Sequence, residues 1–422
     1  MACFRPTYCM LVLLVSFSAS CASAPGGRTR ASATGAGTLA LIGATVIDGT
    51  GAPPLRDGVI VIEAGRITAV GTRDQVAVPG HATRRNVSGL TVLPGLIDSH
   101  VHLALSMVAP GAHESAVDAL LVVLLDQGVT SVRDVGGPYP WMIELARAIE
   151  SGQRAGPRIF AAGPTITAPA GHPAGTLLKG SAEAIELGTR QLRAPGEARP
   201  VVRELAEGGV SLIKVIFDGG SQRSPLGLLP RLDTTTLRAV VSEARAAGLP
   251  VTVHWSNVSE LAHVVAARPT QLEHPGVTPI PDALIEQIAQ SGIAVDPTLV
   301  VYSTILPPNI FSSGPLSNVR RLAARGVVIT AGTDAPLGGL RPGESLHREL
   351  ELLVQAGLTP VQAVQAATGN AARFLGRNAD VGTIAVGKRA DLLFVSGDPA
   401  TSITDIRNVR LVIQNGRVVR QK

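Results

Sequence analysis

Two histidines stand close together near the end of one apolar segment of this sequence, His100 and His102 in residues 95–103. Alternate side chains of a β-strand point to the same side, so both imidazoles would face one surface. Asp98 shares their parity two residues earlier and is a candidate to orient one of the rings. An isolated His-x-His is weak evidence for a metal, because a single buried histidine is usually a hydrogen-bonded core residue. The pair therefore needs support from elsewhere in the chain.

A lysine inside an apolar segment gives that support. Lys214 lies within residues 210–217, whose other members are mostly apolar. A buried ammonium group without a partner costs several kcal/mol. Either Lys214 forms an ion pair inside the fold, or it is chemically altered. Desolvation favours the neutral amine, which can react with CO2 to form an anionic carbamate able to bridge two metal ions.

Three further polar residues follow or close predicted strands later in the chain: His254, His274 and Asp334. The carboxyl ends of the strands of a parallel barrel meet at one rim, where barrel enzymes carry their chemistry. Four imidazoles, a modified Lys214 and one carboxylate form a nitrogen- and oxygen-rich set. Such a set suits Zn²⁺ or a similar divalent ion.

The middle of the chain alternates strand-like and amphipathic helical segments, which predicts the α/β class and a (β/α)8 TIM barrel. A doubly wound open sheet is the competing fold, but no glycine-rich phosphate loop follows the first strand. The predicted strands are 95–103, 129–135, 158–165, 210–217, 250–255, 271–274, 293–298 and 327–332. The helical segments include 116–127, 234–247, 259–267 and 282–290.

Both ends of this barrel region, residues 95–376, are flanked by short strand-like runs with turn signals. Ala64-Gly65 marks one turn and Asn415-Gly416 is a strong hairpin signal. Residues 38–94 and 377–422 are therefore expected to form one small β-sandwich domain built from both chain ends.

The N-terminus is typical of an exported protein. Arg5 precedes a short apolar run and small residues, so residues 1–24 are predicted to be a signal peptide. Cys21 follows Ser-Ala-Ser, which resembles the lipobox of bacterial lipoproteins; plain export is the alternative. Residues 25–37 form a flexible tether. The expected location is the periplasm or the membrane surface, with a membrane tether through a lipidated Cys21.

Composition narrows the function further. Apolar residues make up 45% of the 422 residues, aromatic residues only 3%, and the net charge is +5. The positive charges are scattered, so no nucleic-acid surface is expected. All three cysteines precede residue 25, which leaves no thiolate for catalysis in the rest of the chain. The sequence leaves self-association open.

Six short motifs resemble those of the amidohydrolase superfamily, especially its imidazolonepropionase-like and prolidase-like (Xaa-Pro dipeptidase) branch. The resemblance extends from about residue 38 to the end of the chain. The motifs are PGLIDSHVH at 94–102, GVTSVRD at 128–134, IK at 213–214, EH at 273–274, AGTD at 331–334 and GKRADL at 387–392.

The resemblance implies a binuclear metal site with two divalent ions, for which zinc is the expected metal. His100 and His102 would bind one ion, and carboxylated Lys214 would bridge both. His254 and His274 would bind the second ion. Asp334 would bind the first ion and act as general base, so that a metal-bridged hydroxide attacks a carbonyl.

Three residues are candidates for contact with substrate. His172, in Pro-Ala-Gly-His-Pro, resembles a family histidine that contacts substrate and assists catalysis, although Ala170 stands where family members often have glycine. Arg133 could bind a substrate carboxylate or serve the structure. Trp255 could line the pocket, but strand parity points it away from His254.

The function expected is hydrolysis of the amide or peptide bond of a small molecule, either a dipeptide or an N-acyl amino acid. The alternative is a mononuclear deaminase or a cyclic amide hydrolase of the imidazolonepropionase type. Such enzymes usually need a carboxylate soon after the histidine of the fifth strand, and Trp255-Ser256-Asn257-Val258 has none. A non-catalytic exported binding or scaffold protein would be expected to have lost ligand residues, whereas all six positions are occupied.

Overall fold

The computed structural model of this chain describes residues 37–104, 114–220 and 227–421. The predicted signal peptide, Cys21 and nearly all of the predicted tether lie outside these residues. Among the described residues, no helix is both long enough and apolar enough to cross a membrane.

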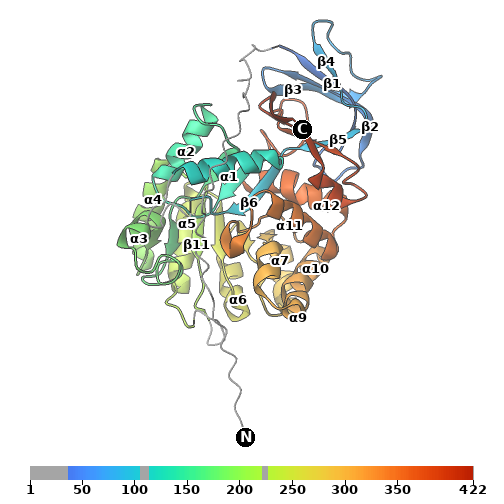
Figure 1. Cartoon of the computed structure of the whole chain (residues 1–422). Helices are drawn as coiled ribbons and strands as arrows, with labels where there is room; N and C mark the ends of the chain where they lie inside the picture. The colour runs from blue at the N-terminus through green and yellow to red at the C-terminus, as the bar shows by residue number, and fades with distance from the viewer. Residues whose placement is uncertain (1–36, 105–113, 221–226, 422) are drawn as a thin grey trace, which may run out of the picture.

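Strands from the two ends of the chain form one eight-stranded sheet, which lies beside the barrel at the upper right of Figure 1. The sheet order is β17-β16-β15-β5-β1-β2-β3, with β4 paired to β1. Apolar side chains from both ends, among them Ile60 and Phe394, meet in one core. This is the small β-sandwich expected beside a TIM barrel. Its strands are β1 (Leu39–Val46), β2 (Leu55–Glu63), β3 (Arg66–Thr72), β4 (Thr83–Asn86), β5 (Leu90–Pro94), β15 (Leu392–Ser396), β16 (Val409–Gln414) and β17 (Arg417–Gln421).

The two predicted turns connect strands of this sheet. Ala64 and Gly65 join β2 to β3, and Asn415 and Gly416 join β16 to β17. All four residues have positive φ, between 49° and 80°. Two-residue hairpins favour this left-handed backbone because it matches the twist of the strands.

The barrel contains eight parallel strand positions, seven of which are built from regular strands. The predicted strand 158–165 is divided in the structure into β8 and β9. A short strand, β10 (Thr189–Gln191), adds to the outer side of β9. The barrel strands are β6 (Leu96–Val101), β7 (Val129–Asp134), β8 (Arg158–Ala161), β9 (Thr165–Thr167), β11 (Ile213–Ile216), β12 (Val251–His254), β13 (Gln271–Glu273) and β14 (Ala294–Asp296).

The eighth position differs from the prediction of a regular strand at 327–332. This segment and the residues just after it are joined to their neighbours by two isolated parallel bridges, Val295 to Ile329 and Val101 to Ala335. The amides of Ser99 and His102 donate to the carbonyls of Ala331 and Ala335, both at 2.9 Å. The segment therefore closes the barrel between β14 and β6 without a continuous ladder.

Helices surround the barrel strands (Figure 1). Four of them confirm the predicted helical segments to within a few residues: α1 (Glu114–Asp126), α5 (Thr234–Ala246), α6 (Val258–Ala267) and α7 (Asp282–Ser291). The others are α2 (Trp141–Glu150), α3 (Ala182–Gly188), α4 (Ala198–Gly208), α8 (Leu299–Ile305), α9 (Pro308–Phe311), α10 (Ser317–Ala324), α11 (Glu344–Gln355), α12 (Pro360–Gln365) and α13 (Ala371–Phe374).

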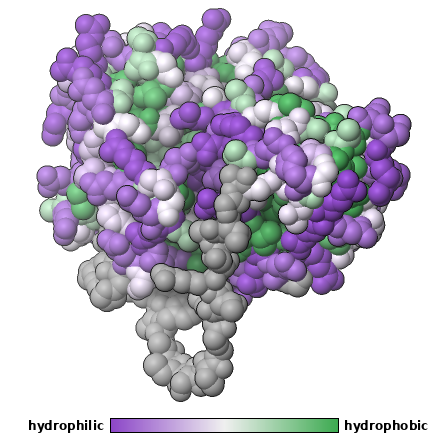
Figure 2. Space-filling view, turned by 90° about the horizontal axis from the view of Figure 1, so that it is seen from above, coloured by the Kyte–Doolittle hydropathy of each residue, from purple (hydrophilic) through white to green (hydrophobic). Residues whose placement is uncertain are grey.

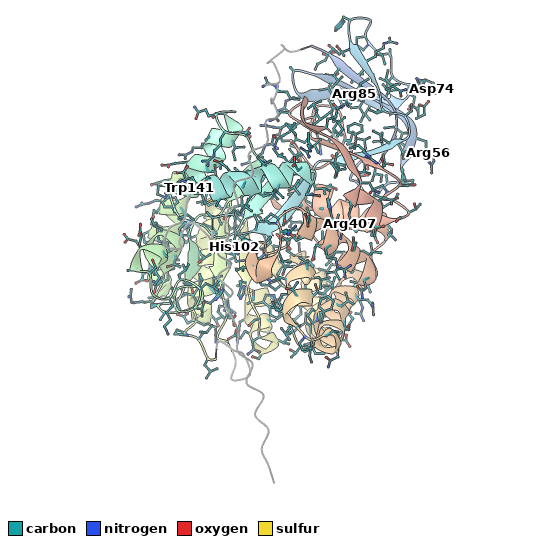
Figure 3. The ribbon with its side chains drawn as sticks, viewed as in Figure 1. Arg56, Asp74, Arg85, His102, Trp141 and Arg407 are labelled. Atoms are coloured by element: carbon teal, nitrogen blue, oxygen red, sulfur yellow. The ribbon has the colours of Figure 1, made fainter. Side chains whose placement is uncertain are left out.

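The face seen in Figure 2 is mostly hydrophilic, with small separate apolar areas between the polar side chains. The labelled side chains of Figure 3 separate the two parts of the molecule: Arg56 and Arg85 lie on the sheet from the chain ends, whereas His102 lies in the barrel. The polar residues singled out from the sequence belong to the barrel.

Candidate metal centre

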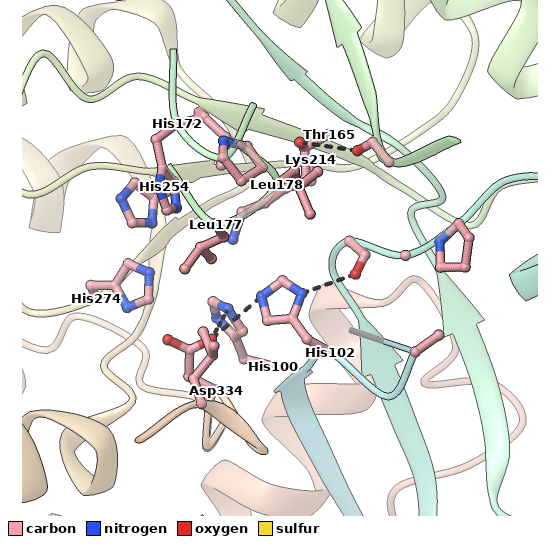
Figure 4. A pocket seen from close by; sticks show the side chains of 18 residues that line it. His100, His102, Thr165, His172, Leu177, Leu178, Lys214, His254, His274 and Asp334 are labelled. Carbon is pink, nitrogen blue, oxygen red and sulfur yellow. Dashed lines mark hydrogen bonds and ion pairs between the residues drawn. The ribbon is translucent and has the colours of Figure 1, made fainter. Parts of the chain in front are cut away.

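One pocket at the carboxyl ends of the barrel strands collects the predicted ligands (Figure 4). It encloses about 670 Å³, part of which is open to solvent, a size typical of small-molecule sites. All six predicted ligand residues and His172 line it: His100, His102, His172, Lys214, His254, His274 and Asp334.

One half of the pocket consists of His100, His102 and Asp334, and is called the acidic half below. Asp334 Oδ1 lies 3.2 Å from His100 Nε2 and 3.4 Å from His102 Nε2. This buried oxygen nevertheless makes no well-directed hydrogen bond with either ring. Ligand atoms of the three residues lie within 4.8 Å of one another. Two imidazole nitrogens and a carboxylate oxygen this close together have the spacing of ligands of one cation, so these residues fit a divalent ion.

The other half consists of His254, His274 and His172, and is called the histidine half below. The ring centroids of His254 and His274 are 4.6 Å apart, and the ring of His172 stacks on His254 at 5.2 Å. The ring of His274 also lies 5.1 Å from that of His100, which connects the two halves. Neutral imidazoles are ordinary ligands of Zn²⁺ and similar ions.

Lys214 lines the pocket with both halves and is only 2% exposed. Within the described part of the chain its amine forms no hydrogen bond or ion pair, although the residue is buried. Burial lowers the pKa of this amine, which favours its neutral form. An internal ion pair, one of the two explanations open from the sequence, is thus not found among the described residues.

Hydrogen bonds fix which ring nitrogen each histidine offers. His102 Nδ1 donates to the carbonyl of Gly136 at 3.0 Å, which leaves Nε2 free. His274 Nδ1 lies 2.8 Å from Thr298 Oγ1, and this also leaves Nε2. His254 is the exception, since its Nε2 lies 3.3 Å from a carboxylate oxygen of Asp218 and Nδ1 remains free. Such partners set ring orientation and tautomer at metal sites.

Left-handed backbone places two of the ligands. His274 and Asp334 have φ of 73° and 63°, and Thr298, the partner of His274, has φ of 45°. This conformation is uncommon for residues with a side chain and concentrates at functional sites. Strand alternation alone would put Glu273 and His274 on opposite sides, whereas the turn lets both point into the barrel.

A buried polar layer lies behind His100. His100 Nδ1 is 2.5 Å from Glu273 Oε2, and Arg133 donates to Glu273 Oε1 at 2.7 Å and to Gln271 at 2.5 Å. Arg133 also lies 3.5 Å from Asp296. Glu273 and Asp296 together with His100 have the spacing of a second metal-binding group. Here, however, the guanidinium already supplies the positive charge, so the layer supports His100 instead of holding a second ion.

This layer corrects the predicted contact of Arg133 with substrate. Arg133 is 3% exposed and is absent from the pocket wall. Its guanidinium donates hydrogen bonds to Ser99, Gln271 and Glu273. These contacts support the structural role of Arg133, which was the alternative open from the sequence.

Trp255 is also placed away from the pocket, contrary to its prediction as a substrate contact. It is 1% exposed and packs so closely on Gly276 that a Cβ there would lie 2.6 Å from the indole. The alternation of side chains along the strand had pointed Trp255 away from the metal face.

Asp98, the predicted orienting partner of a histidine ring, has a different role in the structure. Its carboxylate accepts from the backbone amides of His100 and Thr333 at 3.3 and 3.1 Å.

His172 reaches the pocket from the loop after β9. Its Nδ1 lies 2.7 Å from Thr176 Oγ1, which itself donates to the carbonyl of Pro173. The hydroxyl oxygen therefore accepts from Nδ1, and Nε2 remains free. Ala170 in the same loop has φ of 55°, a conformation that glycine adopts without strain.

The pKa shifts divide along the same two halves. Burial and Lys214 oppose a charge on His100, but Glu273 and Asp334 outweigh them and raise its pKa to about 9. Burial and the neighbouring His254 lower the pKa of His172 to about 3 and hold that of His274 well below its usual range. At neutral pH His100 in the acidic half therefore holds a proton, whereas His172 and His274 in the histidine half are neutral.

Comparison with known proteins agrees with this arrangement. A sequence profile of the amidohydrolase family matches residues 91–419, which is most of the chain. The chain belongs to the amidohydrolase family. It is thus a hydrolase of carbon–nitrogen bonds with a candidate His/Asp metal site, and the resemblance predicted from its motifs is confirmed.

Individual proteins are similar to this chain in sequence or in fold, at modest identity. The chain is 27% identical to ochratoxinase from Aspergillus niger over 400 residues, covering 83% of this chain and 79% of that one. It superposes on molinate hydrolase with a TM-score of 0.77 at 27% identity, covering 91% and 95% of the two chains. A Xaa-Pro dipeptidase with bound methionine in its active site gives 0.76 at 27% identity, covering 91% and 100%.

Sequence reasoning missed three residues that support the ligands of this amidohydrolase: Glu273, Asp218 and Thr298. Each lies at or just beyond the end of a barrel strand, and each contacts a ligand from a different strand. Glu273 was visible only as part of the EH motif. A buried acidic residue beside a predicted ligand is the signal that could have identified it.

Proposed function

We propose that the protein is a metal-dependent amidohydrolase that cleaves the amide bond of small substrates, either dipeptides or N-acyl amino acids. The observation that carries this proposal is the convergence of both ligand halves on one buried lysine without a partner. His100, His102 and Asp334 would hold one divalent ion, zinc being the expected metal, and His254 and His274 a second. Lys214, as a carbamate, would bridge the two.

The ions, when bound, would activate a water molecule and polarise the scissile carbonyl. The protein's own groups would move the protons. Asp334 lies on the pocket wall with a pKa held well below its usual range, because His100 and His102 outweigh its burial. It is thus ionised at neutral pH and able to accept the proton of the attacking water and pass it to the leaving amine. His172 Nε2 faces the same pocket as a neutral donor or acceptor for substrate.

The pocket wall favours substrates with apolar groups next to the amide. Lys214 is the one Lys or Arg among the described wall residues, and as a carbamate it would no longer be cationic. The apolar part of the wall consists of Ala104, Pro138, Pro173, Leu177, Leu178, Ile216 and Leu337. We expect an apolar side chain or acyl group to be preferred over a charged one.

The deciding experiment compares the metal-loaded and the metal-stripped protein on a library of dipeptides, N-acyl amino acids and cyclic amides. Free amino acids and ammonia are measured separately. Metal-dependent release of amino acids is expected. Ammonia without amino acids would instead establish the deaminase alternative. That alternative gains one structural argument, since the carboxylate of Asp218 lies beside His254, but Asp218 is not part of the pocket wall.

The proposed location follows from the N-terminal sequence alone. We propose export through the predicted signal peptide and a membrane tether through Cys21. Cell fractionation tests both: the protein should sediment with membranes, and Cys21→Ser should release it into the soluble exported fraction. Retention in the cytoplasm would contradict export.

A further inference from the structure

We propose that Asp218 is a positioning residue that fixes the tautomer of His254, so that this ring offers Nδ1 to a metal while the other three ligand histidines offer Nε2. The proposal rests on the proposed function, because it assigns a partner to one ligand of that metal centre. It predicts that Asp218 controls one of two metal sites and does not touch the substrate.

The contacts of Asp218 hold its carboxylate in one place. It lies two residues after the end of β11 and four residues after Lys214, and its side chain is 8% exposed. Oδ1 accepts from Ser256 Oγ and from the amide of Gly220, both at 2.8 Å. Oδ2 is left for His254 Nε2 at 3.3 Å. An ionised carboxylate can only accept, so Nε2 carries the proton and Nδ1 keeps the lone pair that a metal needs.

The loop that carries Asp218 is fixed from its other side as well. The amide of the next residue, Gly219, donates to Glu260 Oε2 at 3.2 Å, and Arg231 pairs with Glu260 Oε1 at 2.7 Å. The Arg231 guanidinium lies over the ring of Phe217, 4.4 Å from its centroid. A Cβ at Gly219 would lie 2.6 Å from Glu260. The backbone next to Asp218 is thus held by α6, which leaves the carboxylate little freedom to turn away from His254.

The position of Asp218 outside the pocket wall excludes direct contact between its carboxylate and the substrate. His254 lines the pocket, where its ring stacks on that of His172 and meets that of His274 edge to face, whereas Asp218 is absent from the pocket wall. Asp218 therefore acts through the imidazole. The arrangement parallels Glu273 and His100 in the acidic half, but it engages the opposite ring nitrogen. Carboxylates that hold a metal-binding histidine in this way typically contribute about 10- to 100-fold to metal affinity or activity.

The test compares the full-length protein with Asp218→Asn, which keeps the shape and removes the charge. Zn²⁺ binding is measured by chelator competition, and ¹⁵N NMR of the histidines reports their tautomers. We expect one of two zinc equivalents to weaken about 10- to 100-fold while the other keeps its affinity. We also expect one histidine to lose its Nε2-protonated form. Activity should fall at limiting zinc and recover at excess zinc.

Matched variants separate the outcomes. Asp282→Asn removes an exposed carboxylate paired with Arg321 and should change neither zinc equivalent. Ser256→Ala removes one support of the Asp218 carboxylate and should weaken the same zinc equivalent by a few fold; it decides the question if Asp218→Asn does not fold. Two zinc equivalents of unchanged affinity in the folded variants would overturn the role of Asp218. A wild-type protein whose hydrolysis needs no metal would instead overturn the proposed function.

Discussion

The two halves of the pocket both bring imidazoles together, but the surroundings shift the pKa values of these rings in opposite directions. In the acidic half, carboxylates surround His100 and its pKa is raised to about 9. In the histidine half, burial and neighbouring rings hold the pKa of His172 and His274 below its usual range. A cation entering the acidic half must displace the proton of His100, whereas His172 and His274 are already neutral at neutral pH. The comparison shows that imidazoles of one pocket can be held in different protonation states by different surroundings.

The residues that hold the imidazoles of the two halves also differ in their location. Behind His100 lies a fully buried layer in which Arg133 balances Glu273 and Asp296. Behind His254 lies Asp218 in a loop held by hydrogen bonds to Gly220 and Ser256. The first support is part of the barrel core, and the second is local to one strand end. Disturbing the first should therefore affect folding as well as metal binding.

The largest effect should come from removing the residue shared by the halves. Lys214→Ala is expected to lower activity by more than about 100-fold, beyond the loss typical of an orienting partner, and to lower metal content. Added short carboxylic acids should restore part of the activity by replacing the carbamate. Lys179→Ala, an exposed lysine outside the pocket wall, is the control. Near-normal turnover of Lys214→Ala without added acid would contradict a bridging lysine.

Removing the positive charge of Arg133, which lies behind the acidic half, should lower the stability of the protein. Arg133→Met leaves Glu273 and Asp296 buried without their counter-charge, so we expect the free energy of unfolding to fall by about 3–5 kcal/mol. Urea denaturation of the metal-free protein measures it. Arg73→Met, which removes an exposed ion pair with Asp57, should change stability little. Normal stability with only a raised KM would restore the substrate-binding role for Arg133.

The stability of the metal-free protein should depend on pH with opposite sign in the two halves. The pKa of His100 is raised from 6.5 to about 9, so its contribution is complete below pH 6.5 and is lost as pH rises through about 9. The pKa of His172 is lowered from 6.5 to about 3, so its contribution is present above pH 6.5 and is lost as pH falls toward 3.

The measurement is the free energy of unfolding from urea titrations across this pH range. His100→Gln should remove part of the loss on the alkaline side, and His172→Gln part of the loss on the acidic side. Bound Zn²⁺ should suppress the alkaline loss, because it replaces the proton on His100. Identical pH profiles for wild type and both variants would contradict the division of the pocket.

The smallest effect concerns the apolar wall. Leu177 lines the pocket although it is 50% exposed, so Leu177→Ala should lower kcat/KM for an apolar substrate by about 3- to 10-fold. Stability should change by less than about 0.5 kcal/mol, as is usual for exposed positions. Val386→Ala, at an apolar position that is 63% exposed and is not part of the pocket wall, should change neither. An unchanged kcat/KM for Leu177→Ala would remove this residue from substrate selection.

Local pattern was enough to predict much of this molecule. Alternation along single strands placed His100 with His102 and pointed Trp255 away from the pocket, and the turn at Asn415 and Gly416 followed from residue type. The rhythm of strands and helices predicted the barrel, because each of these signals spans only a few neighbouring residues. The choice of the candidate ligand residues needed no knowledge of their hydrogen-bond partners.

The tertiary structure alone decided which nitrogen each histidine offers and what supports it. Glu273 meets His100 across 173 residues, and Arg133 meets Glu273 across 140. Such pairs exist only once the barrel closes, and nothing in the local sequence specifies them. Closure also left 327–332 as a segment joined by isolated bridges, because ladder pairing depends on neighbouring strands and not on the segment itself. The sequence thus determined which groups reach the rim, and packing across the barrel determined their charge and orientation.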